Sequence, residues 1–151
     1  MKKIVFWDLD GTLIDTLEDL GAAVNHVLAL RDLPQLSSED FRKMVGHGVR
    51  NLVAQALEKA AELGDVADGS ADVAGRGWQV VASGGDRPAL ETVRTDAYID
   101  AALADFKEYY CANIDVFTRP YPGMPELLSE LSAAGVKMAV VSNKFQEGTE
   151  H

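Results

Sequence analysis

The sequence predicts an α/β protein in which two parallel strands flank a long helical insertion. Two apolar runs, KIVFWD at residues 3–8 and VKMAVV at residues 136–141, have the length and the β-prone content of strands. Both runs are apolar nearly throughout and are followed by polar residues, which is typical of parallel sheets. Between them, apolar residues recur at helical spacing, and this pattern predicts the insertion.

A first amphipathic helix is expected after the first strand, with Asp15 or Thr16 as its N-cap and Leu33-Pro34 beyond its end. Its apolar face consists of Leu17, Leu20, Val24, Val27 and Leu28. A short helix is expected over residues 41–45, because residues 37–40 (SSED) offer a cap and an acidic first turn.

The clearest amphipathic helix is expected over residues 49–63, after a break at residues 46–48 and before Gly64, a favourable residue for a helix end. Residues 64–88 hold six of the 13 glycines, so we expect a mobile or poorly ordered loop there, with a local strand at residues 79–82.

Helical spacing returns near Thr95, on a face formed by Ile99, Leu103, Phe106 and Tyr110. Pro125 suits the first turn of a last helix, which is expected to end near Ala134. That helix has Leu127, Leu128 and Leu131 on its apolar face.

The charge and composition of the chain argue against several classes of binding partner. The formal net charge of −10 repels nucleic acid and anionic membranes, so we expect neither as a partner. Cys111 is the sole cysteine, and no apolar run reaches the roughly 18 residues of a membrane span or the core of a signal peptide. These features lead us to expect a cytoplasmic protein. An anionic ligand would need local help from a cation or from backbone N–H groups.

The strongest chemical signal is DLDGT at residues 8–12, directly after the first strand. The Asp8 and Asp10 carboxylates repel each other unless a divalent cation lies between them, and Mg²⁺ suits such oxygen ligands. One carboxylate can attack phosphorus while the other transfers a proton. A solvated Asp-Gly turn is the alternative. A calcium-binding EF-hand loop is excluded, because Thr12 and Leu13 occupy positions that need an acidic or amide residue and a glycine.

Ser142, Asn143 and Lys144 follow the second strand. Because ligands bind at the carboxyl ends of parallel strands, we expect these residues to lie near the two aspartates. A hydroxyl and neighbouring amides suit a phosphoryl oxygen that gains charge in the transition state. Lys144 is either a source of positive charge in the site or an exposed lysine at the start of the next helix.

The strand followed by DLDGT and Asp15-Thr16 resembles the first motif of the haloacid dehalogenase (HAD) superfamily, and VVSN at residues 140–143 resembles the second. The resemblance implies a Rossmann-like core of parallel strands, residues 1–15 plus 115–151, with an inserted α-helical cap domain, residues 16–114. It also implies that Asp8 is the nucleophile and a metal ligand, and that Asp10 is the general acid/base, with its backbone carbonyl as a second metal ligand. The implied phosphate-binding residues are Gly11, Thr12, Ser142, Asn143 and Lys144.

Within the cap, GHGVR at residues 46–50 resembles the GNG segment of phosphoglycolate phosphatases, with His47 in place of the usual Asn. RPYPG at residues 119–123 and AVVSNK at residues 139–144 continue the resemblance. It implies that His47, Gly48 and Arg50 meet the far end of a small phosphate ester. The alternative for His47 is a residue at the start of a helix that is hydrogen-bonded to the backbone. The alternative for Arg50 is a solvated helix residue.

The resemblance therefore implies a Mg²⁺-dependent phosphatase that hydrolyses a small phosphorylated metabolite, such as 2-phosphoglycolate, through an aspartyl-phosphate. The alternatives are a sugar-phosphate mutase and a catalytically dead fragment that acts by association. The lysine and acidic pair of the later HAD motifs are not found before His151. We therefore expect an incomplete chain that hydrolyses phosphate esters poorly or not at all, and whose unpaired sheet edges offer a surface for self-association.

Overall fold

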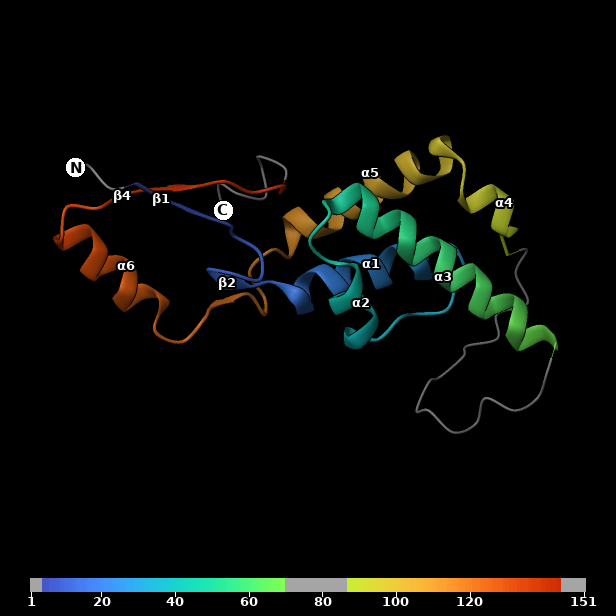
Figure 1. The fold of residues 1–151 in the computed structure, drawn as a ribbon. Helices are drawn as coiled ribbons and strands as arrows, with labels where there is room; N and C mark the ends of the chain where they lie inside the picture. Colours follow the sequence, from blue (N-terminus) through green and yellow to red (C-terminus); the bar gives the residue numbers. More distant parts are fainter. Residues whose placement is uncertain (1–3, 70–86, 145–151) are drawn as a thin grey trace.

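The computed structural model describes residues 4–69 and 87–144, and within them a small strand region adjoins a larger helical region (Figure 1). Strand β1 (Ile4–Trp7) pairs in parallel with β4 (Lys137–Val140). Strand β2 (Ile14–Asp15) pairs antiparallel with β3 (Arg119–Pro120). The chain is thus a mixed α/β protein with a parallel strand pair and a helical insertion, as the sequence predicted.

The parallel pair brings the two sequence motifs together. Its register places Ile4 opposite Lys137 and Trp7 opposite Val140. The Val141 amide also donates to the Trp7 carbonyl at 2.8 Å, which extends the pairing by one residue. Because both strands run in the same direction and end at the same level, the loops that follow them leave side by side.

The two predicted strands are more exposed than their apolar sequences led us to expect. Phe6 is 67 % exposed and Val141 62 % exposed. Helix α6 (Met124–Ala133), which begins near Pro125 as predicted and lies beside β4, has no buried residue. Within the described residues, β1 and β4 have only each other as sheet neighbours, so the outer edges of both strands are unpaired.

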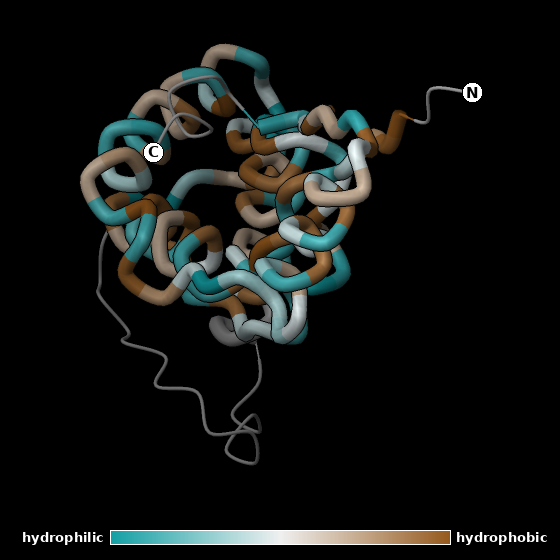
Figure 2. Tube along the Cα trace, turned by 90° about the vertical axis from the view of Figure 1, so that its left-hand side faces the viewer, coloured by the Kyte–Doolittle hydropathy of each residue, from teal (hydrophilic) through white to brown (hydrophobic). Residues whose placement is uncertain are grey.

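The hydrophobic core lies in the helical region, between α1 (Leu17–Ala29), α3 (Val49–Gly69) and α5 (Asp96–Ala112). Brown apolar segments recur along the helices between teal polar ones (Figure 2). Burial confirms the predicted faces of α1 and α5, except that Ala102 rather than Leu103 is the fully buried residue of its turn. The face predicted for α6, with Leu127, Leu128 and Leu131, is not buried. The largest fully buried side chains are Tyr110, Phe106, Leu28, Leu57, Val24, Val27, Val53 and Val93.

One prediction about the middle of the chain needs correction. Helix α3 continues through Gly64 to Gly69, so the first part of the predicted glycine-rich loop at residues 64–88 is helical. A glycine inside a helix costs only about 1 kcal/mol, and at Gly64 the Arg87 and Pro34 side chains lie within 4 Å of where a Cβ would be. The predicted strand at residues 79–82 lies outside the described residues. Helix α4 (Leu90–Val93), a single turn, was not predicted.

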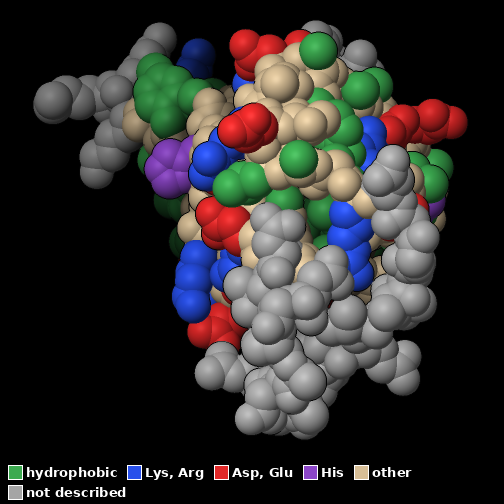
Figure 3. All heavy atoms as spheres, turned by 90° about the vertical axis from the view of Figure 1, so that its right-hand side faces the viewer, with side chains coloured by type: hydrophobic (Ala, Val, Ile, Leu, Met, Phe, Trp, Pro, Cys, Tyr) green, Lys and Arg blue, Asp and Glu red, His purple; other side chains and the backbone are tan. Residues whose placement is uncertain are grey.

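The surface of the helical region is charged. Viewed from the α4 end, acidic and basic side chains are interspersed (Figure 3). Arg94 donates to Glu58 there and links the chain after α4 to α3. None of the described helices combines the length and the apolar character that crossing a membrane requires.

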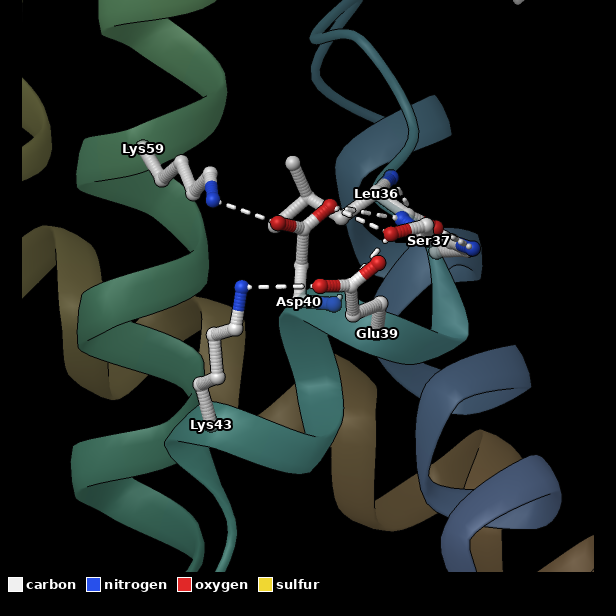
Figure 4. Close-up of polar contacts among 7 residues, drawn as sticks. Leu36, Ser37, Glu39, Asp40, Lys43 and Lys59 are labelled. Atoms are coloured by element: carbon white, nitrogen blue, oxygen red, sulfur yellow. Dashed lines mark hydrogen bonds and ion pairs between the residues drawn. The ribbon is translucent and has the colours of Figure 1, made fainter. Parts of the chain in front are cut away.

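Helix α2 (Ser38–Met44) begins at a capping box, as its sequence predicted (Figure 4). The Ser37 hydroxyl accepts from the Asp40 amide at 3.2 Å, and the Asp40 carboxylate accepts from the Ser37 amide at 3.1 Å. Lys59 of α3 donates to the same carboxylate. Burial alone would raise the pKa of Asp40, but the bonds from Lys59 and Ser37 outweigh it and lower the pKa from 3.8 to about 2.

We therefore expect Asp40 to make the fold sensitive to acid. Its folded-state pKa lies below its unfolded-state value, so its contribution is fully present above pH 3.8 and is lost as the pH falls toward 2. This shift of the pKa corresponds to about 2 kcal/mol at neutral pH, and the side chain, which is only 17 % exposed, is little screened by solvent. Urea unfolding at pH 7 and pH 2.5 should show a smaller acid loss for Asp40→Asn than for the parent chain.

Glu39→Gln is the matched control, because Glu39 forms a largely exposed pair with Lys43 one turn along the same helix. Such pairs contribute little to stability. An equal acid loss in the Asp40→Asn variant and the parent chain would contradict the prediction.

Candidate active site

The turn after β1 fixes the two aspartates at the end of the strand. The Leu9 carbonyl accepts from the amides of Leu13 at 3.0 Å and Ile14 at 3.2 Å. Gly11 has a φ of +79°, a left-handed conformation that favours glycine. Asp8 follows β1 directly, and its Oδ1 accepts from the Leu9 amide at 2.9 Å. This tight turn holds both carboxylates beside the loop that follows β4.

The aspartates line a pocket between the strand ends and the helices. From the strand side it is lined by Asp8, Asp10, Ser142, Asn143 and Lys144. From the helical side it is lined by Leu20, Val45, Gly46, Gly48, Val49 and Leu52. The pocket thus brings together the two motifs that lie more than 130 residues apart in the sequence, with polar groups on one side and mainly apolar groups on the other.

The side chain of Lys144 is buried in this pocket, in contrast to the alternative of an exposed lysine. Its side chain is 3 % exposed, and its Nζ donates to Asp10 Oδ1 at 3.0 Å. It also donates to the Tyr110 hydroxyl at 2.7 Å. The Lys144 amide donates to Ser142 Oγ at 3.1 Å, which ties the serine and the lysine of the loop together.

Tyr110 is the residue of the site that sequence reasoning missed. It lies in the last turns of α5, and its position on the apolar face indicated only a core residue. Burial raises the pKa of the Tyr110 phenol, and the nearby Asp10 and Asp19 carboxylates raise it further, so the hydroxyl stays neutral at physiological pH. The available signal was chemical, because a buried tyrosine hydroxyl needs a polar partner.

The cap residues predicted to contact substrate are only partly brought to the pocket. Gly48 lines it, whereas His47 is exposed and is not among the lining residues. Arg50 points to α5 instead, where it donates to Asp96 at 2.6 Å and to Asp100 at 3.2 Å. The sequence could not show this, because the aspartates that pair with Arg50 are about 50 residues away.

Gly11 and Thr12 belong to the turn but do not line the pocket. The Thr12 amide donates to the Leu9 carbonyl at 3.3 Å, and the Gly11 amide to the Ile14 carbonyl at 2.9 Å. Their backbone groups are therefore used in shaping the turn that presents the two carboxylates.

Two carboxylates are available to a metal ion in this pocket, those of Asp8 and Asp10. Across residues 4–69 and 87–144, no cluster of three or more acidic, His or Cys side chains is suited to hold one. Mg²⁺ commonly takes one or two protein carboxylates and completes its shell with waters and phosphate oxygens. The donor set of the pocket therefore fits Mg²⁺ better than it fits a metal that needs an all-protein shell.

The sequence profile of the haloacid dehalogenase-like hydrolases matches residues 5–151, and the chain belongs to this family. It is 34 % identical to a phosphoglycolate phosphatase of Caulobacter vibrioides, over 93 % of this chain and 47 % of that protein. It is 31 % identical to the phosphoglycolate phosphatase of Mesorhizobium japonicum, over 96 % of this chain and 51 % of the relative. The chain thus spans about half the length of these relatives.

Solved structures agree with this assignment. A crystal structure of a predicted phosphoglycolate phosphatase from Haemophilus somnus superposes with a TM-score of 0.73 at 28 % identity. The superposition covers 97 % of this chain and 53 % of that one. The strand pair and the helical insertion therefore have the arrangement expected of a HAD-like fold.

Proposed function

We propose that the protein hydrolyses a small organic phosphomonoester, with 2-phosphoglycolate as the first candidate. The observation that carries the proposal is the pocket in which Asp8 and Asp10 meet Ser142 and Lys144. The phosphoglycolate phosphatases among its relatives support the choice of substrate.

In the proposed reaction, Asp8 attacks phosphorus and the bond from phosphorus to the ester oxygen breaks. Asp8 Oδ1 accepts from the Leu9 amide, so Oδ2 is the oxygen assigned to the attack. Asp10 gives its proton to the departing oxygen. A water molecule then attacks the aspartyl-phosphate, Asp10 takes the proton of that water, and phosphate leaves with the Asp8 carboxylate restored.

The other pocket residues are assigned to binding. Ser142, Asn143 and Lys144 would hold the phosphoryl oxygens, and their hydrogen bonds would strengthen as those oxygens gain charge. Mg²⁺, held by the Asp8 carboxylate and the Asp10 backbone carbonyl, would offset the charge of the phosphate when bound. The Lys144 ammonium group, 3.0 Å from Asp10 Oδ1, adds positive charge beside the acidic pair.

The helical insertion, residues 16–114, is proposed to act as a cap over this site. Val45, Val49 and Leu52 present apolar surface to the pocket, and the Gly46 and Gly48 backbone leaves room for a small organic group. A cap of this kind keeps bulk water away from the reacting phosphate. In this assignment Gly48 is near the substrate, whereas Arg50 mainly ties α3 to α5.

Binding and turnover together test the proposed function. Calorimetric titration of the 151-residue chain with 2-phosphoglycolate should show binding that requires Mg²⁺ and is abolished by EDTA. Release of inorganic phosphate, measured in parallel, should show the same metal dependence. Absence of Mg²⁺-dependent binding would overturn the proposal. Binding of 2-phosphoglycolate without release of phosphate would favour the alternative of a catalytically dead fragment.

A further inference from the structure

The Lys144 ammonium group is held by residues from two regions of the fold. It lies on the loop after β4, yet one of its two acceptors, the Tyr110 hydroxyl, comes from α5 of the helical insertion. The other acceptor is Asp10 Oδ1, which is 3.0 Å away. A buried ammonium group is costly unless it is paired and hydrogen-bonded, so both acceptors are needed to keep it inside the pocket.

Tyr110 is itself rigidly placed. Its residue is 1 % exposed, and its ring stacks on Phe106 with centroids 5.3 Å apart and an angle of 16°. The Lys144 Nζ lies 5.0 Å from the centroid of the Tyr110 ring, within the range of a cation–π contact. The hydroxyl and the ring therefore both constrain where the ammonium group can lie.

An ammonium group has three N–H donors. Within the described residues, Lys144 Nζ has two acceptors, Asp10 and Tyr110, which leaves one N–H for a ligand. Lys144 also lines the pocket, so that remaining donor is available to a phosphate oxygen there.

We propose that Tyr110 is a positioning residue, which holds the Lys144 ammonium group between Asp10 and the pocket so that its third N–H meets the phosphoryl group. The inference rests on the proposed function, because it assigns Tyr110 a part in phosphate binding. It also means that the helical insertion helps to set the charge of the site through a residue that does not itself touch the substrate.

The first test compares Tyr110→Phe with the parent chain in binding inorganic phosphate in the presence of Mg²⁺, followed by ³¹P NMR titration. The variant keeps the ring and loses the hydroxyl, so phosphate should bind about 10-fold more weakly. Tyr109→Phe is the matched control, because Tyr109 is the preceding residue of α5 and stacks on His26 instead. Its phosphate affinity should equal that of the parent, and thermal melting verifies that both variants fold.

A double-mutant cycle separates positioning from a general structural effect. In a Lys144→Met background, Tyr110→Phe should cause no further loss of phosphate affinity, because the group through which it acts is already gone. Equal affinity in Tyr110→Phe and the parent, or a further 10-fold loss in the Lys144→Met background, would overturn the inference.

A second measurement needs no phosphate. Acetylation of Lys144 by a small acylating reagent, followed by mass spectrometry, should be about 5- to 10-fold faster in Tyr110→Phe than in the parent or in Tyr109→Phe. An unchanged rate overturns the inference while the proposed function stands. A parent chain that binds no phosphate with Mg²⁺ overturns the proposed function, and with it the use of this lysine for phosphate.

Discussion

Replacing Asp8 with asparagine is expected to abolish whatever weak Mg²⁺-dependent phosphate release the chain shows, down to the level seen with EDTA. The amide that replaces the carboxylate is neutral and a poor nucleophile, so the aspartyl-phosphate cannot form. Release of phosphate from 2-phosphoglycolate, measured under conditions that saturate the parent chain, checks this result.

Asp15→Asn is the matched control for Asp8→Asn. Asp15 lies seven residues further along, is exposed, and accepts from the Leu17 amide at the start of α1. It does not line the pocket, so the variant should keep the parent rate. Parent-like release by Asp8→Asn would exclude Asp8 as the nucleophile.

Substitution of Asp10 separates its role from that of Asp8. If Asp10 protonates the departing oxygen, Asp10→Asn should affect substrates with poor leaving groups most. A p-nitrophenyl ester, whose leaving group needs no proton, should therefore lose less rate than 2-phosphoglycolate does. Equal losses on both substrates would argue against proton transfer by Asp10.

The second large effect is expected on stability. Asp19 of α1 is 3 % exposed, and its carboxylate accepts from the amides of Phe117 at 3.0 Å and Thr118 at 2.7 Å. It also accepts from the Thr118 hydroxyl at 2.7 Å. Asp19→Ala leaves these donors without their acceptor, and we expect it to lower the free energy of unfolding by about 3 kcal/mol.

Urea unfolding monitored by circular dichroism measures this loss, and Glu18→Ala is its control. Glu18 is the adjacent residue in the first turn of α1 and is exposed, so its removal should change stability by less than about 0.5 kcal/mol. Similar small losses in both variants would show that the contact between α1 and the segment before β3 contributes little.

The longer helices and the two parallel strands were predictable because their signals are local. The faces of α1 and α3 repeat at helical spacing, and the capping box of α2 lies within four residues. The strands β2 and β3 carried no such signal, since each is two residues long and β3 contains Pro120, which cannot donate to a ladder.

The candidate site was predictable where the two motifs at the strand ends defined it. Asp8, Asp10 and Ser142 could be placed together because parallel strands end at the same edge. The Tyr110 contact and the pairing of Arg50 with Asp96 depend on how α5 packs against the rest of the fold. Contacts between residues so far apart in the sequence cannot be predicted from the local residue pattern.

The antiparallel pairing of β2 with β3 joins the segment that leads into the helical insertion to the segment that leads out of it. Ile14 lies opposite Pro120, and the Tyr121 amide donates to the Leu13 carbonyl at 3.1 Å. The two ends of the segment between these strands therefore lie side by side. An exchange of that intervening stretch must match these two neighbouring attachment points and must also supply the contact that Tyr110 makes with Lys144. A helical segment that meets these conditions can replace the present one without changing the turn that holds Asp8 and Asp10.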